Sequence, residues 1–263
     1  AKKGVPVQIE SVRGVHEVVI YRIENGSEVE ALRETKNGEH TLNYAPEIDF
    51  TEATSKLKVV VSDGREGKEA IGYMKAYVNM DVATLNVGSQ PLANNAHVKY
   101  PDAFGMVSLN DLKTYSVDYA IANEVNAKNV DFKFYCFGAS GSPRLYSMDN
   151  TGKDGEFSGS TGKLSAIKVK NLTRFAILSN FDYENATVAS ISSEILSSSI
   201  AQSLLDPIAV GNVIAFRTGG SSAAGGGRIG VMKVINITEP KELVSNNATA
   251  RVMTVEIKFP KKK

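Results

Sequence analysis

The chain has 263 residues, with 30 Lys and Arg against 29 Asp and Glu, a formal net charge of +1 and 42% hydrophobic residues. The balanced charge argues against a polybasic nucleic-acid binder, and the single cysteine excludes a disulfide scaffold and a Cys-based zinc site. The hydrophobic share is typical of a folded protein, and the length favours two domains. We therefore expect a two-domain protein with no nucleic-acid partner.

No stretch approaches the roughly 18 consecutive apolar residues of a membrane-spanning helix, so we expect no transmembrane span. The chain begins at Ala1 without an initiator methionine. We therefore expect either a processed form or a shortened one, so any targeting segment or lipid-anchor cysteine of the precursor lies outside this sequence.

Residues 1–79 contain short stretches of β-type sequence that are separated by turn signals. Apolar and polar residues alternate over 5–9, and Asn-Gly or Asp-Gly dipeptides follow at 25–26, 37–38 and 63–64. Six or seven short strands with such turns are typical of an immunoglobulin-like β-sandwich, which we predict here. The strands are expected at residues 5–9, 16–23, 27–33, 40–44, 57–61 and 70–78.

Residues 80–263 show a different pattern, with two helical stretches among strands. One helix is predicted near 116–126, where Ser116 can cap the N-terminus, and a second near 187–205, which ends before Pro207. Because the strands do not alternate regularly with helices, we predict a larger, mostly β domain with two helices. Its clearest strands are expected at residues 130–137, 213–218, 228–237 and 251–259.

Four segments of this second part suggest a family. Residues 115–135 are a short helix followed directly by a strand, and residues 171–175, 210–218 and 230–237 complete the pattern. Together they resemble uncharacterised surface or secreted lipoproteins of Bacteroidetes-type bacteria over roughly residues 80–260. The resemblance implies a cell-envelope location, at the outer-membrane surface or secreted, and a binding or scaffolding role beside nutrient-uptake machinery. It assigns no catalytic or ligand residue.

A glycine-rich loop at 219–227 is the most conspicuous motif. A phosphate cradle needs its glycines between a strand and the N-terminus of a helix, whereas this loop is expected to join two strands. It also lacks the Gly-Lys-Ser/Thr ending. We therefore interpret it as a flexible hairpin loop, with an interaction role left open.

Two further motifs come close to catalytic or metal-binding patterns. Gly138–Ser142 resembles a nucleophile elbow, but Ser142 replaces the last glycine and Pro143 follows, so we interpret it as a surface turn. Asp149–Glu156 has some features of a calcium loop, although Gly152 and Thr161 stand at two ligand positions. A polar turn is the preferred interpretation there, and a weak calcium site is the alternative.

The remaining candidates are isolated side chains. His16, His40 and His97 are too far apart in sequence to form a metal motif, and His40 is expected to pack beside Leu42 and Tyr44. Cys136 shares its strand face with Phe132 and Phe134, which predicts a buried core residue. Tyr73 and Tyr77 are expected on one strand face, either as a glycan platform or as packing residues. A solvated, positively charged tail is expected at Lys258 and 261–263.

We therefore assign no catalytic, cofactor or metal residue, and the ligand stays unknown, with a glycan or a protein as the classes considered. The expected function is a non-enzymatic binding or adhesion protein of the cell envelope, acting as an accessory component of nutrient or glycan capture. The alternative is a structural subunit of a fimbrial or surface-layer assembly, which an unpaired edge strand would favour.

Overall fold

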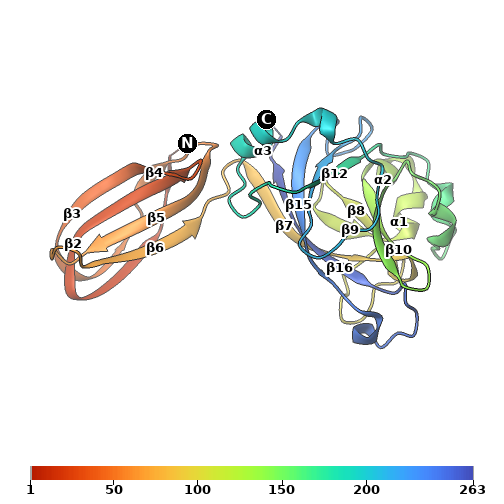
Figure 1. Cartoon of the computed structure of the whole chain (residues 1–263), viewed down its shortest axis with the longest axis horizontal. Coiled ribbons are helices and arrows are strands. Elements are labelled where there is room, and N and C mark those ends of the chain that lie inside the picture. The colour runs from red at the N-terminus through yellow and green to blue at the C-terminus, as the bar shows by residue number, and fades with distance from the viewer. Residues whose placement is uncertain (1, 263) are drawn as a thin grey trace. The chain divides into compact units, whose positions relative to one another are not determined.

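The computed structural model describes residues 2–262. It contains 45% strand and 13% helix, which confirms the mainly β fold class (Figure 1). The chain forms two compact units, and each is described by itself. The N-terminal unit comprises residues up to Met80 together with Glu184–Ser193, and the C-terminal unit comprises Asp81–Tyr183 and the chain from Glu194 onward. None of the helices within residues 2–262 is long and apolar enough to cross a membrane.

The N-terminal unit has two antiparallel sheets around one apolar core. The larger sheet has the strand order β3-β2-β5-β6, and the smaller one pairs β1 with β4. Val18, Ile20 and Leu57 of the larger sheet pack with Val5 and Ile48 from the other side. The strands are β1 (Lys2–Gly4), β2 (Val7–Glu24), β3 (Ser27–Tyr44), β4 (Glu47–Asp49), β5 (Thr54–Ser62) and β6 (Glu69–Lys75).

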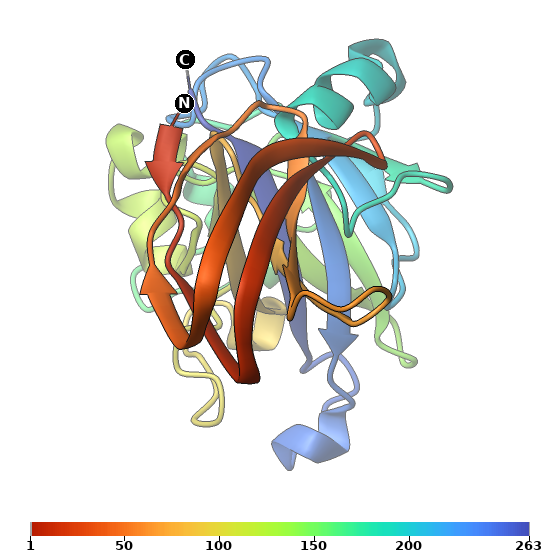
Figure 2. The same cartoon turned by 90° about the vertical axis from the view of Figure 1, so that its left-hand side faces the viewer.

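Six strands agree with the predicted number of six or seven, but several begin and end at other residues than predicted. Asn25-Gly26 forms the predicted two-residue hairpin turn, with positive φ angles of 51° and 82° and Glu24 opposite Ser27. The second turn, predicted at Asn37-Gly38, is wrong: β3 continues through it as one 18-residue strand beside β2 (Figure 2).

The reason is a pair of compensating bulges in β2 and β3. Between the pairs Glu10–Thr41 and Val15–Glu39, β2 advances five residues while β3 advances two. In the next step, to the pair Glu17–Thr35, β2 advances two residues while β3 advances four. Gly14 and Gly38, with φ angles of 88° and 83°, occupy the bulges. An added Cβ at Gly14 would lie 2.3 Å from the carbonyl oxygen of Gly38, so only glycine fits.

The C-terminal unit has two five-stranded antiparallel sheets, one with the order β13-β11-β10-β8-β9 and one with the order β12-β14-β15-β16-β7. The strands are β7 (Met80–Gly88), β8 (Met106–Ser108), β9 (Lys113–Tyr115), β10 (Phe132–Phe137), β11 (Ser142–Ser147), β12 (Arg174–Leu178), β13 (Leu204–Leu205), β14 (Val213–Arg217), β15 (Ile229–Ile237) and β16 (Val252–Pro260).

Side chains from both sheets form one core, and a second core lies on the other face of β10. Phe132, Phe134 and Cys136 point into the first, which confirms the predicted burial of the cysteine. Tyr135 points into the second, which the helices and the loops of residues 150–170 cover. The short helices of this unit are α1 (Val117–Ala122), α2 (Glu124–Lys128), η1 (Gln90–Leu92), η2 (Asp154–Glu156), η3 (Leu164–Ala166), η4 (Ser197–Ser199) and η5 (Pro240–Leu243).

Both predicted helices are shorter than expected. The one at 116–126 is split into α1 and α2, because Asn123 is extended and caps the second helix by accepting a hydrogen bond from the Asn126 N–H. Ser116 caps α1 as predicted. The one at 187–205 shrinks to α3 (Val188–Glu194), followed by η4 at the serine-rich stretch, because serine is a weak helix former.

The prediction for Lys258 is also wrong. The strand at 251–259 is confirmed as β16, and Met253, Val255, Ile257 and Phe259 point into the first core. Lys258 lies on the other face of β16 but is fully buried rather than solvated. Its ammonium group donates to the carbonyl oxygen of Tyr183 at 2.6 Å and lies 4.4 Å from the centre of that ring.

We expect Gly14→Ala to lower the free energy of unfolding of the N-terminal unit by at least about 3 kcal/mol, since the new Cβ meets the β3 backbone. Gly26→Ala is the matched control: φ is positive there too, but an added Cβ meets nothing within 4 Å, so a loss of about 1 kcal/mol is expected. Urea unfolding followed by circular dichroism measures both. Equal losses would contradict the bulge geometry.

Candidate functional site

A buried ion pair lies beneath the loop that follows β11. The alternation of β10 places Lys133 beside Tyr135 on the face of the second core, and its side chain is fully buried. Its ammonium group donates to Asp154 Oδ1 at 2.6 Å and to the carbonyl oxygen of Asn150 at 3.0 Å. Burial lowers the pKa of Lys133, and the Asp154 charge opposes that shift. The pair fastens η2 and its loop to the sheet.

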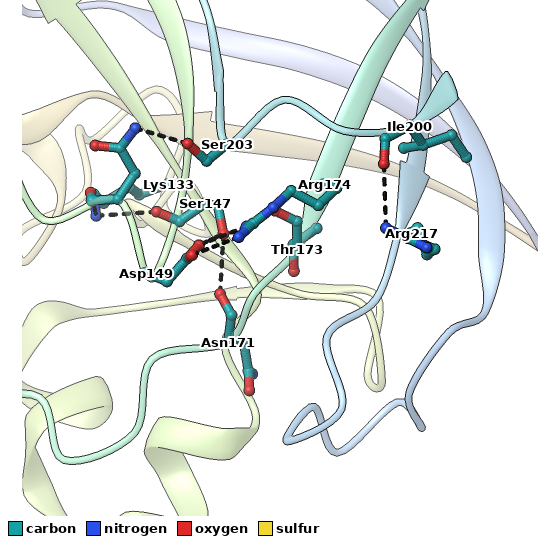
Figure 3. A network of polar contacts seen from close by, with 10 residues as sticks. Lys133, Ser147, Asp149, Asn171, Thr173, Arg174, Ile200, Ser203 and Arg217 are labelled. Carbon is teal, nitrogen blue, oxygen red and sulfur yellow. Dashed lines mark hydrogen bonds and ion pairs between the residues drawn. The ribbon is translucent and has the colours of Figure 1, made fainter. Parts of the chain in front are cut away.

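A second ion pair lies at the start of the same loop (Figure 3). Arg174 of β12 holds Asp149 with two parallel hydrogen bonds, both 2.8 Å long. Ser147 also donates to this carboxylate. Burial alone would raise the pKa of Asp149, but the bonds from Arg174 and Ser147 outweigh it and leave the pKa lowered. Asp149 is therefore a structural anion that joins two strands.

A third buried carboxylate, Asp131, lies just before β10. Its two oxygens accept hydrogen bonds from the Leu109 N–H at 2.8 Å and from the Ser222 hydroxyl at 2.6 Å. Burial raises the pKa of Asp131 to about 6, because the two donors only partly compensate for the lost hydration. Asn171 lies beside it and donates to the carbonyl oxygens of Lys128 and Val130 at 2.8 Å each.

The glycine-rich loop 219–227 belongs to this cluster. It joins β14 to β15, as predicted, but it is anchored rather than free. Ser222 and Ala224 are buried, and Ser221 donates to the side-chain oxygen of Asn171 at 2.6 Å. The Ala223 N–H donates to the carbonyl oxygen of Lys128 at 2.9 Å. The glycines let the loop fold onto Asp131, and no helix begins there to bind an anion.

The calcium alternative for Asp149–Glu156 finds little support in this geometry. The carboxylates of Asp149 and Asp154 bind Arg174 and Lys133, so protein cations already neutralise both. Across residues 2–262, no group of three or more His, Cys, Asp or Glu side chains is placed to hold a metal ion.

The other sequence candidates take no part in this network. Gly138–Ser142 forms the hairpin turn between β10 and β11, which confirms the surface turn. Burial raises the pKa of the Cys136 thiol to about 12, which makes it unreactive. His40 is exposed and contacts the Ser11 carbonyl oxygen at 2.9 Å, so its predicted packing is wrong.

Two pockets in the C-terminal unit offer no catalytic arrangement. One, of about 410 Å³, is bordered by residues 84–86, Asp102, Phe104 and residues 113–114. The other, of about 280 Å³, lies between residues 177–181 and residues 194–195. Among the residues that border these two pockets, no nucleophile is paired with a base.

The N-terminal unit has a more apolar groove, which we call the Phe50 groove. It has a volume of about 230 Å³ and lies between residues 3–6, Phe50 and residues 74–79. Tyr77 borders it, whereas Tyr73 does not. The predicted pairing of Tyr73 and Tyr77 on one strand face is wrong, because β6 ends at Lys75. An aromatic groove with a few polar groups at its rim is suited to bind one sugar ring or one side chain.

Comparisons with known proteins give no relative: no protein-family model, no curated protein and no solved structure matches the chain. The resemblance of residues 80–260 to Bacteroidetes-type surface lipoproteins therefore stays a prediction.

Sequence reasoning missed the whole buried polar network. One signal for it is present in the sequence. Alternation along strand β10 puts Lys133 on the same face as Tyr135, and both faces of this strand are buried. The partner of Lys133, Asp154, lies 21 residues away in the sequence, and Asn171 lies 43 residues from Lys128, whose carbonyl oxygen it binds. Nothing in the local sequence of Asp154 or Asn171 marks them as buried.

We expect Lys133→Met to lower the free energy of unfolding of the C-terminal unit by about 3–5 kcal/mol, because Asp154 loses its buried cation and retains a 3.9 Å contact with the partly exposed Lys170. The double variant Lys133→Met/Asp154→Leu should recover most of that loss. Urea unfolding measures both, with the reaction of the buried Cys136 thiol as the signal for this unit. A double variant as unstable as the single one would show that the pair is not the cause.

The raised pKa of Asp131 gives a pH dependence of defined sign. Between about pH 4 and pH 6 the folded state binds the extra proton, so the free energy of unfolding falls as the pH rises, by at most about 3 kcal/mol. Asp131→Asn should remove this fall in urea unfolding at pH 4.5 and pH 7. Asp118→Asn is the control. Hydrogen bonds from Thr161 and Ser160 lower the pKa of Asp118, so this group changes the stability only below about pH 4. An unchanged pH dependence in Asp131→Asn would contradict the assignment.

Proposed function

We propose that this chain is a non-enzymatic binding or adhesion protein of the bacterial cell envelope, acting as an accessory component of glycan capture. The Phe50 groove carries the proposal, because it places two aromatic side chains, Phe50 and Tyr77, beside the polar groups of Lys3 and Asn79. Aromatic faces with a few hydrogen-bonding groups at the rim suit a sugar ring.

A binding role without catalysis is supported by how the ionisable groups of the C-terminal unit are used. The buried Lys133 and Asp154 neutralise one another, and Asp131 is held by Ser222. Catalysis needs such groups poised in a cleft that a substrate can reach. Here they fix loops to a sheet instead.

The envelope location rests on the sequence resemblance of residues 80–260. A signal peptide with a lipidated cysteine in the precursor would support it, and the gene sequence upstream of Ala1 tests it directly. A precursor that lacks any export signal would contradict the envelope location while leaving the binding role intact.

We expect the protein to bind glycans on an array of bacterial, host and plant polysaccharides. A soluble oligosaccharide chosen from that array should bind Tyr77→Ala about tenfold more weakly in calorimetry, because stacking on the ring is lost. Tyr73→Ala is the matched control, since Tyr73 is exposed but does not border the groove.

Two outcomes would overturn the glycan proposal. One is the absence of binding to any glycan on the array at high protein concentration. The other is a ligand whose affinity falls in Tyr73→Ala but not in Tyr77→Ala, because the Phe50 groove would then not be the site.

A structural subunit is the second candidate, and β6 is the observation that favours it. Among the described residues β6 pairs only with β5, so its outer edge is open to another strand. Assembly through this edge into filaments would appear in electron microscopy at rising protein concentration.

A further inference from the structure

The β6 edge differs from an ordinary protected sheet edge. All seven residues of Glu69–Lys75 are exposed, on both faces of the strand. Ile71, Tyr73 and Met74 have exposed fractions of 52%, 64% and 43%, so apolar side chains accompany the unpaired backbone groups. Such an edge is a template for a further strand. Figure 1 shows β6 as the outermost strand beside β5.

Neither backbone conformation nor packing within the single chain requires glycine at position 72, the centre of β6. An added Cβ there would meet nothing within 4 Å, and its φ lies outside the left-handed region that demands glycine. Glycine weakens a strand interior, and it often marks a place where another backbone approaches closely. Gly72 therefore points to a strand that lies against β6.

We propose that the occupant of this edge is β6 of a second copy of the chain, paired antiparallel about a two-fold axis at Gly72. In that register Gly72 faces Gly72, Ile71 faces Tyr73 and Ala70 faces Met74, so each face of the joined sheet stays continuous. Apolar residues meet apolar residues over the whole centre of the strand.

The charges at the two ends of β6 fit the same register. Glu69 of each copy lies opposite Lys75 of the other, which forms two symmetric ion pairs. Within one chain, Lys75 lies across from Lys56 of β5, a pairing of like charges. Lys75 also contacts Glu184 at 2.9 Å, and the two side chains are 44% and 54% exposed. The second copy's Glu69 adds an opposite charge at this end of the strand.

Neighbouring registers lose this complementarity. A shift that centres the axis on Tyr73 places Lys75 opposite Ile71 and moves Glu69 beyond the end of the paired strand. A shift that centres it on Ile71 places Glu69 opposite Tyr73 and leaves Lys75 outside the strand. Only the register centred on Gly72 pairs all seven residues with their symmetry mates.

The pairing has a consequence for assembly. A two-fold contact uses the same surface on both copies and closes on itself, so it forms dimers and not filaments. The joined sheet has eight strands, four from each copy. This inference does not require glycan binding, although β6 shares Met74 and Lys75 with the border of the Phe50 groove.

Sedimentation velocity of the full chain at about 1–200 µM tests the proposal by charge exchange. Lys75→Glu and Glu69→Lys each place like charges opposite one another twice, so we expect each to weaken the dimer at least about tenfold. The double variant Glu69→Lys/Lys75→Glu restores the opposite charges and should restore dimerisation. Glu69→Lys makes the same test without removing the contact between Lys75 and Glu184.

The matched control exchanges an exposed ion pair elsewhere in the chain. Glu124 and Lys128 lie one turn apart on α2 and contact each other at 2.6 Å. The double variant Glu124→Lys/Lys128→Glu should dimerise like the original chain. A chain that stays monomeric over the whole concentration range, forms filaments, or dimerises equally well in all β6 variants overturns the proposal.

Disulfide cross-linking tests the register itself. Opposite residues of an antiparallel pair have Cα atoms about 4.5–5.5 Å apart, within the range of a disulfide. Gly72→Cys should therefore give a covalent dimer on oxidation, while the buried Cys136 stays unreactive. In Ala70→Cys the two thiols lie four residues apart along the strands, about 13 Å, and should not cross-link. Equal cross-linking at both positions, or none at Gly72→Cys, overturns the register.

Discussion

The buried ion pair of Lys133 and Asp154 is the interaction on which the C-terminal unit most depends. An ammonium group with no exposed surface is costly unless a partner neutralises it, so the loop carrying Asp154 must close over β10 whenever the unit is folded. That loop is also tied down by Asp149 and Arg174. The position of the covering layer is thus set by charge as well as by apolar packing.

Strand β10 also shows how much of the burial pattern can be predicted from the sequence. Alternation predicts that Phe132, Phe134 and Cys136 share a face, and they do. It also places Lys133 on the opposite face, but a charged residue in a strand usually indicates solvent on that side. Lys258 misleads in the same way. In both strands the second face is covered by loops distant in sequence, and local periodicity carries no information about them.

Turn chemistry has a similar limit. Asn25-Gly26 and Asn37-Gly38 carry the same dipeptide, yet one is a hairpin turn and the other a bulge within a strand. What separates them is Gly14, whose bulge on β2 compensates for the one at Gly38 and keeps the two strands paired. The presence of Gly14 opposite Gly38, 24 residues away in the sequence, therefore decides between a turn and a bulge. The Asn-Gly dipeptide alone does not distinguish the two.

The two edges of the larger N-terminal sheet are protected to different degrees. The outer strand β3 has six charged residues and a bulge, both of which oppose pairing with another chain. At the other edge, β6 is regular and charged only at Glu69 and Lys75, with apolar residues between them. Because a sheet that merely avoided aggregation would need both edges blocked, the contrast favours a partner for β6. Because Glu69 and Lys75 lie at the ends of β6, they can fix the register of two paired β6 strands while leaving the apolar centre free to pair.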